Sequence, residues 1–361
     1  MTHRGNGVLA APRVRRCRLA DYEPYAEPGL LEDIESLGRR VAGLRVLHLS
    51  NRDAGADPAP AGLRSLLALE RDVGLESEWL VPWADADARH AADVGDWWPR
   101  PSEAQWSSWV SFNFRAARDI EGSWDVAVVH GASLAGVAAI ASDRAGRWLW
   151  QVDDAVDPLA PHNARLARGV ARRMGRILDL DFDRPFLCHI ARFAPWVELD
   201  AVIGAYWEAK QANPELQLVV GGAAAGRDAR GHKSVGARAS EDDDLHVLPR
   251  LSSLEIAALR NAASINVRGP APAGHTVDVR ECHWIGRPVL AWPPGNGVAR
   301  LPLDGYTPHA ADAVRVTGLQ IAELLMSHDD SRGHAAVRSD HLIVHSLRDT
   351  LRTLASVVAA R

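Results

Sequence analysis

The sequence predicts an α/β protein with two domains, each a doubly wound parallel sheet covered by helices. Its 361 residues are 47% hydrophobic and 24% charged, a composition typical of globular proteins, and this length favours two domains. Short apolar runs alternate with amphipathic runs, and this alternation is typical of parallel sheets with helices on both faces. The alternation begins again after a Pro- and Arg-rich middle, so the second half is expected to be a second domain of the same class.

In the first half, strand-like and helix-like segments follow one another. The first strand-like run is LRVLHLS at 44–50, and a Gly- and Pro-rich stretch separates it from an amphipathic segment at 61–75. Two further strand-like runs are ESEWLVP at 76–82 and WDVAVVHGA at 124–132. The latter leads through small residues into a helical segment at 133–144, which completes a pattern of buried strands joined by helices.

The second half repeats this pattern, and several of its strands end at glycine or proline. The predicted strands lie within 184–193, 216–222, 244–249, 264–269 and 287–293. The predicted helices lie at 199–214, 251–263, 276–286 and 346–361.

These patterns divide the chain into domains. We predict an N-terminal domain over residues 1–154, a linker over 155–184 and a C-terminal domain over 185–345. The last helix, 346–361, is expected to cross back to the N-terminal domain. Doubly wound sheets bind ligands outside the carboxyl ends of their strands, so the expected ligand site is a cleft that both domains face.

Charge and cysteine usage argue against several classes of function. The formal net charge is −5, so no overall positive field attracts nucleic acid. Cys17, Cys188 and Cys282 are widely spaced and odd in number, which predicts neither a disulfide framework nor a zinc site. No run reaches the roughly eighteen apolar residues of a membrane span, and the first apolar stretch is too short for a signal peptide. We therefore expect a cytoplasmic protein without a transmembrane segment.

Several stretches of the chain together resemble one enzyme family. Among them are RPFLCHIARF, DLHVLPRLSSLEIAALRNAASINV and ECHWIGRPVLA. The full set of similar stretches is 18–81, 184–222, 244–267, 281–291 and 338–355. They resemble the trehalose synthase group of retaining glycosyltransferases, family 4, whose fold is GT-B: two Rossmann-like domains that face a cleft.

The resemblance implies an activity and its substrates. Members of this family move a hexose from a nucleoside diphosphate to an acceptor hydroxyl, with retention at the anomeric carbon and without a metal. The expected small-molecule partners are therefore a nucleotide-sugar donor and a sugar acceptor, with no cofactor. A homodimer or a catalytic partner protein is a further expectation.

The resemblance also places a phosphate site after the first strand of the second domain. Transfer leaves negative charge on the departing diphosphate, which fixed cations stabilise, and the planar guanidinium of arginine suits phosphate oxygens. Arg192 occupies the position of the family's arginine, whereas Val197 stands where the family has a lysine. Arg192 is therefore a candidate donor-binding residue, and its alternative is a structural arginine at a strand end. Arg268 or Arg280 are candidates to supply the missing cation.

A second site segment corresponds to the family's Glu-x7-Glu element, which holds the donor sugar and the ribose. Here Glu281 matches the second carboxylate, whereas Ala273 replaces the first. Gly274 is retained, and His275 and Thr276 stand where an aromatic residue and a glycine usually follow. Gly274, His275 and Glu281 are the predicted donor-binding residues of this segment. The alternative role of Glu281 is to favour the helix dipole.

In the first domain, the resemblance indicates one catalytic candidate and one ligand-side loop. His130 ends a predicted strand at the position of a cleft-facing histidine of the family, where it would contact the acceptor or the leaving group. The loop NRDAGADPAPAG carries Gly55 and Gly62, which would let the backbone approach a ligand, but also two prolines that remove N–H donors. A capped structural histidine and an ordinary strand-to-helix connection are the respective alternatives.

The segment WLWQVDDAVDPLAPHN at 148–163 resembles two family segments joined directly. The N-terminal domain is therefore expected to be shortened by more than the roughly 30 residues of a βαβ unit. Three functions stay open: a transferase with a modified donor site, a catalytically inactive relative that acts as a binding or partner subunit, and a transferase for a bulky acceptor. The acidic pairs Asp85/Asp87 and Asp181/Asp183 are expected to be solvated surface and not a metal site.

Overall fold

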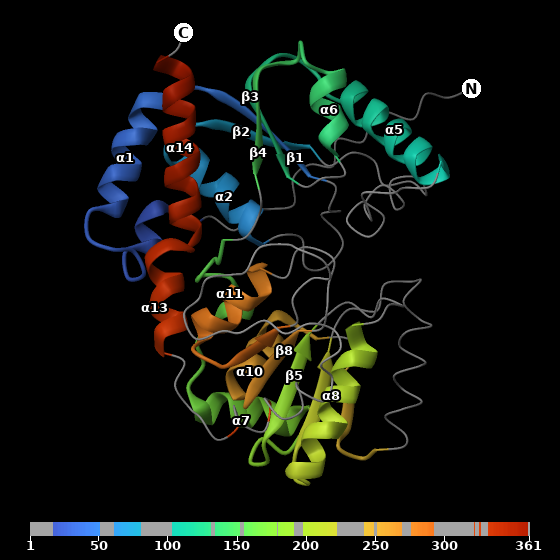
Figure 1. Cartoon of the computed structure of the whole chain (residues 1–361). Coiled ribbons are helices and arrows are strands. Elements are labelled where there is room, and N and C mark those ends of the chain that lie inside the picture. The colour runs from blue at the N-terminus through green and yellow to red at the C-terminus, as the bar shows by residue number, and fades with distance from the viewer. Residues whose placement is uncertain are drawn as a thin grey trace. The chain divides into compact units, whose positions relative to one another are not determined.

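A computed structural model describes most of the chain, which forms two compact units (Figure 1). The first unit comprises Met1–Asp157 together with Leu342–Arg361, and the second comprises Pro158–His341. The described residues are 17–50, 61–80, 103–130, 134–151, 155–178, 180–190, 198–221, 242–248, 251–268, 276–291, 321, 325 and 331–359.

The first unit contains a four-stranded parallel sheet in the order β2-β1-β3-β4. Its strands are β1 Arg45–Ser50, β2 Glu76–Leu80, β3 Trp124–His130 and β4 Ala145–Gln151. Its helices are η1 Leu19–Tyr22, α1 Leu30–Val41, α2 Ala61–Asp72, α5 Glu103–Arg118, α6 Ala135–Ile140 and α14 Ile343–Ala359.

Side-chain alternation decides which helices cover each face of this sheet. Leu47 and Leu49 of β1 join Ala127 and Val129 of β3 in a buried cluster with residues of α5 and α6. Figure 1 shows α5 and α6 together beside the sheet, and α1, α2 and α14 together on its other side. Residues of the opposite parity, His48 among them, therefore point toward α2.

The C-terminal helix α14 belongs to the first unit, where it packs against α1 and α2. Leu347, Leu351 and Leu354 of α14 are buried, and their spacing places them on one helix face. The domain boundaries that we predicted from the sequence, at residues 154, 184 and 345, remain predictions. The two compact units described above are divided at residues 157 and 341. No described helix is long and apolar enough to cross a membrane.

The second unit contains a five-stranded parallel sheet in the order β7-β6-β5-β8-β9. Its strands are β5 Phe186–Ile190, β6 Gln217–Gly221, β7 Leu245–Leu248, β8 Ile265–Arg268 and β9 Val289–Ala291. Its helices are η3 Pro161–Asn163, α7 Arg168–Ile177, α8 Glu198–Ala212, α10 Ser253–Ala262, α11 Thr276–Ile285 and α13 Ser331–Asp340.

Helices cover both faces of the second sheet. Residues of α8 share one buried cluster with Leu187 and Leu218, whereas Leu259 of α10 packs with Phe186 and Cys188 on the opposite face. The helix α7 lies within the segment expected to be a linker and packs against α10. The predicted fold class, an α/β protein with two Rossmann-like units, is confirmed.

A charged cluster joins β7 to the helix α8 in the second unit. Asp244 accepts a hydrogen bond from Arg184 at 2.7 Å and lies 2.9 Å from the ammonium of Lys210. Lys210 also donates to Asp242 at 2.6 Å. The hydrogen bond from Arg184, together with that from Lys210, lowers the pKa of Asp244 from its ordinary 3.8 to about 2 despite partial burial.

We predict that Asp244→Asn lowers the free energy of unfolding at pH 7 by about 1–2 kcal/mol, because a depressed carboxyl pKa is a stabilising term. This contribution of Asp244 to the free energy of unfolding is present above pH 4. It is lost as the pH falls through about 2, which is the pKa of Asp244 in the folded state. Urea unfolding of both proteins between pH 2 and 7 measures the difference. Asp183→Asn, at a carboxylate with 73% of its side chain exposed, is the control. An equal loss at both ends of the pH range would contradict this assignment.

Candidate functional site

The strand order of the second unit reverses between β5 and β8. The chain places β6 and β7 on one side of β5 and returns to place β8 and β9 on the other side. At such a switch point the loops after the two central strands diverge, and ligands of doubly wound sheets bind there. The carboxyl ends of β5 and β8 therefore mark the candidate site of this unit.

A buried arginine joins these two strand ends. Arg268, the last residue of β8, has 1% of its surface exposed. Its Nη1 donates a hydrogen bond of 2.7 Å to the carbonyl oxygen of Ile190, the last residue of β5. A guanidinium charge is thus held at the switch point, and guanidinium groups make strong, often bidentate hydrogen bonds with anionic oxygens.

The predicted donor-binding residues lie partly outside the described residues. Arg192 and Val197 follow β5 and are not described, and neither are Ala273, Gly274 and His275, which precede α11. In sequence, Arg192 is two residues beyond Ile190. Their predicted ligand contacts therefore stay predictions. Arg280, the other candidate cation, lies on α11 and is partly buried.

Glu281 lies in the body of α11 within a buried polar cluster. Its Oε2 accepts a hydrogen bond of 2.7 Å from Arg260, whose side chain is 3% exposed. Its Oε1 lies 2.9 Å from His162 Nε2 and accepts from Asn163 Nδ2 at 3.3 Å. The carboxylate thus forms an ion pair with α10 and holds η3 in place. Its predicted role as a ribose ligand remains a prediction.

His130 of the first unit ends β3, and its imidazole contacts a second histidine. His130 Nε2 lies 2.9 Å from His48 Nδ1, and the two rings are stacked with centroids 5.2 Å apart. His48 Nε2 lies 2.8 Å from Glu70 Oε2, which also accepts a hydrogen bond of 2.6 Å from Ser77. All four residues are buried, with exposed fractions between 0% and 3%. A carboxylate and two imidazoles therefore form a chain that reaches the carboxyl end of the sheet.

His48 and Glu70 were not among the candidates from the sequence, although a signal for Glu70 was present. The buried face of α2 carries Leu63, Leu66 and Leu67, and the next position of this apolar stripe is Glu70. A carboxylate on an apolar stripe is buried and needs a partner. The partner, His48, lies at a buried position of β1. The other interior residues of this strand are apolar.

Gly55 and Gly62 were predicted to lie in a loop beside a ligand, and the structure describes only one of them. Gly55 lies outside the described residues, whereas Gly62 is the second residue of helix α2 and not part of a loop. A Cβ at Gly62 would lie 3.7 Å from the carbonyl oxygen of Ala155, which is ordinary contact. This position therefore has no need of a glycine to avoid a clash, and the close approach of a ligand to Gly62 stays a prediction.

Among the described residues, no group of three or more His, Cys, Asp or Glu side chains could hold a metal ion. Asp85 and Asp87 are outside the described residues, and Asp181 caps a turn by accepting from the backbone N–H of Asp183 at 2.9 Å. All three cysteines belong to the described part of the chain, where they are buried and form no disulfide.

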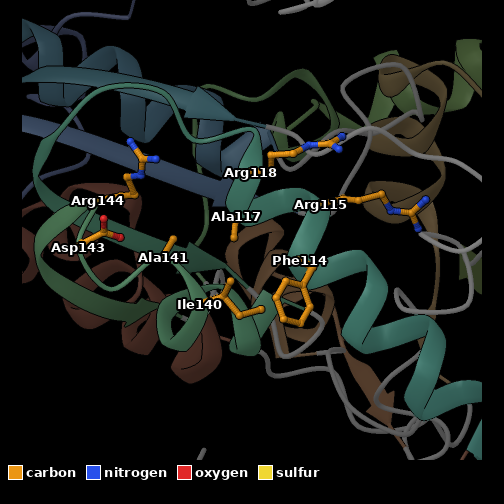
Figure 2. Close-up of a pocket in the computed structure, with 8 residues that line it drawn as sticks. All are labelled: Phe114, Arg115, Ala117, Arg118, Ile140, Ala141, Asp143 and Arg144. Atoms are coloured by element: carbon orange, nitrogen blue, oxygen red, sulfur yellow. The ribbon is translucent and has the colours of Figure 1, made fainter.

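An open pocket of about 450 Å³ lies at the end of the first sheet that is opposite to His130 (Figure 2). It is lined by residues of α5, the end of α6 and the turn before β4, and Figure 2 shows Phe114 and Ile140 among the eight lining side chains. Asp143 and Arg144 precede the first residue of β4, whereas His130 ends β3. The two ends of a strand of this length are about 20 Å apart, so the pocket is separate from the His130 site.

Comparisons with known proteins agree with this architecture. No protein-family model matches the chain. The trehalose synthase of Rubrobacter xylanophilus is 26% identical over 408 residues, covering 94% of this chain and 97% of that protein. The trehalose synthase of Thermococcus litoralis is 23% identical over 348 residues, covering 80% of this chain and 84% of that protein. The first alignment is longer than the chain, so it contains gaps in this sequence.

Solved structures share the fold at low sequence identity. An α,α-trehalose 6-phosphate synthase from Burkholderia multivorans matches with a TM-score of 0.63 and 12% identity, covering 88% of this chain and 99% of that chain. Anabaena Alr3699/HepE in complex with UDP and glucose matches with a TM-score of 0.56 and 13% identity, covering 87% and 100%. The fold is therefore of the GT-B glycosyltransferase class, as expected. Within that class the chain resembles the trehalose synthases in sequence.

We predict that Glu281→Ala lowers the free energy of unfolding by about 3 kcal/mol, because it removes the carboxylate that faces the buried Arg260. Arg260→Met combined with Glu281→Leu is expected to cost less than the sum of the two single changes, since no buried charge is then left behind. Urea unfolding is measured for Glu281→Ala, Arg260→Met, Glu281→Leu, the double variant and the parent, and the last four of these proteins form the double-mutant cycle. Additive effects would contradict a buried ion pair.

Proposed function

We propose that this protein transfers a hexose from a nucleoside diphosphate sugar to an acceptor hydroxyl, with retention at the anomeric carbon and without a metal ion. The similarity to trehalose synthases over 94% of the chain supports this class of reaction. The fold supports it independently, because matching structures include an α,α-trehalose 6-phosphate synthase and a protein in complex with UDP and glucose.

One observation carries the proposal: a guanidinium charge at the switch point of the second sheet. Transfer of the sugar leaves negative charge on the diphosphate, so a preorganised cation close to it stabilises the transition state. The chain has Val197 where the resembling family has a lysine. Arg268 holds its charge beside the end of β5, from which Arg192 is two residues removed in sequence. We assign Arg268 the role of the second cation.

The remaining candidates take roles consistent with this assignment. Glu281 would bind ribose hydroxyls through a carboxylate that Arg260 and His162 orient. Gly274 and His275, in the segment before α11, would lie near the donor sugar. In the first unit, His130 at the end of β3 would accept a hydrogen bond or a proton from a sugar hydroxyl.

The first experiment is calorimetric titration of the full chain with a panel of nucleoside diphosphate glucoses. We expect one donor to bind, and we expect Arg192→Ala and Arg268→Gln each to weaken its affinity about 10- to 100-fold. This range corresponds to the loss of one charge-assisted hydrogen bond of about 1.5–3 kcal/mol. Arg268→Lys, which keeps the charge but not the planar fork, should lie between the parent and Arg268→Gln.

Arg172→Ala is the matched control, since this arginine of the same unit has 44% of its side chain exposed and pairs with Asp183. Thermal melting of each variant separates loss of binding from loss of the fold. Absence of heat with every donor, in a folded protein, would overturn the proposal and leave a non-catalytic binding protein. Where a donor and an acceptor are found, the anomeric coupling constant of the product decides between retention and inversion.

A further inference from the structure

Polar contacts link four buried side chains of the first unit in the order Ser77, Glu70, His48 and His130. We call the last three of them the Glu70–His48–His130 relay. Ser77, Glu70, His48 and His130 come from β2, α2, β1 and β3, four elements of the first unit. Val46 of β1 pairs with Ser77, and Ser50 pairs with His130, so alternation puts Ser77, His48 and His130 on the same face of the sheet. The helix α2 covers this face and inserts Glu70 between them.

Hydrogen-bond chemistry gives this chain a direction. A carboxylate only accepts, so the 2.8 Å contact places the proton on His48 Nε2, which donates to Glu70. In a neutral His48, Nδ1 is then an acceptor, and the 2.9 Å contact with His130 requires a proton on His130 Nε2. His130 is thereby held in the tautomer whose Nδ1 is the basic nitrogen.

We propose that Glu70 and His48 are positioning residues that set the tautomer of His130 and store the proton it accepts. This inference rests on the proposed function for its use in catalysis, but not for its geometry. When the acceptor oxygen bonds to the anomeric carbon and the diphosphate leaves, the hydroxyl proton passes to His130 Nδ1. The N–H bond at His130 Nε2 then breaks and a new one forms at His48 Nδ1. The charge then resides on the imidazolium of His48, beside the carboxylate of Glu70.

The burial of Glu70 supports this role. Its side chain is 0% exposed, its Oε2 contacts His48 and Ser77, and its Oε1 makes no hydrogen bond with any described residue. A buried pair of this kind is weak as a source of stability, because desolvation offsets the attraction. A negative charge kept in this position is most useful when His48 becomes positive, as in catalytic carboxylate–imidazole pairs.

The test combines ring-nitrogen NMR of ¹⁵N-histidine-labelled full-length protein with steady-state kinetics. The His130 signals are assigned by their loss in a His130→Gln variant. In the parent we expect a proton on His130 Nε2 and none on Nδ1. Glu70→Gln keeps the side-chain volume, and its amide can donate to His48 Nε2, so we expect a readily detected Nδ1-protonated population of His130.

With a donor and an acceptor in hand, Glu70→Gln should lower kcat about 10- to 100-fold, while KM for the nucleotide sugar changes less than about threefold. The expected loss is smaller than the roughly 10²- to 10⁴-fold effect of a general acid–base group itself, because His130 is still present. Ser77→Ala is the first control, since it removes one hydrogen bond to Glu70 but leaves the carboxylate, and it should keep the parent tautomer. Asp157→Asn is the second, since this buried carboxylate contacts Tyr22 and Ser65 in the same unit. It should affect stability and not the His130 ring.

The possible outcomes separate this inference from the proposed function. If the His130 ring has the same protonation in the folded parent and in folded Glu70→Gln, the Glu70–His48–His130 relay is overturned. This outcome does not depend on which substrate the protein uses. A His130 that carries its proton on Nδ1 in the parent would overturn it as well. A parent protein without transferase activity but with the expected tautomer change would overturn the catalytic use and leave the positioning established.

Discussion

All strands of each sheet run parallel, so every carboxyl end in a sheet arrives at the same edge. Because helices cover both faces, the central strands are mostly apolar and buried, and buried polar side chains are tolerated only where partners compensate them. His130 and Arg268 are the last residues of β3 and β8, and both are buried. The edge at which parallel strands end is thus also the place where each unit brings its chemically useful side chains.

Glu281 and Glu70 illustrate two ways in which a buried carboxylate is compensated. Glu281 faces Arg260, and the pair is surrounded by further hydrogen bonds from η3, so both oxygens are engaged. Glu70 instead faces a histidine and places both of its hydrogen bonds on one oxygen. A guanidinium is always charged, whereas an imidazole changes charge near neutral pH. The first arrangement therefore suits a fixed structure, and the second suits a group that exchanges protons.

Much of the fold could be predicted from the sequence, because buried strands and amphipathic helices have clear patterns. Eight of the nine described strands fall within a predicted strand-like run, and the exception is β4, Ala145–Gln151. The helix α7 lies in a segment whose Pro- and Arg-rich composition indicated a linker. The candidate site could be predicted only in part. His130 was found through a family resemblance, but contacts between β1, α2 and β3 depend on sheet register, which the sequence does not display. Glu70 was visible only as an exception on an apolar stripe.

Cations at the switch point of the second sheet come from different positions in this chain and in the resembling family. At the switch point the resembling family holds two cations in one segment after the first strand, and this chain has Arg192 and Val197 there. Arg268 brings a cation to the same sheet edge from the neighbouring strand, where packing and the Ile190 carbonyl hold it rigidly. A rigid cation costs desolvation during folding but needs no reorganisation when a diphosphate binds. Under the proposed function, a fixed arginine on an adjacent strand in place of a lysine changes the geometry of the phosphate clamp more than its charge. The consequence expected from this change is an altered donor preference.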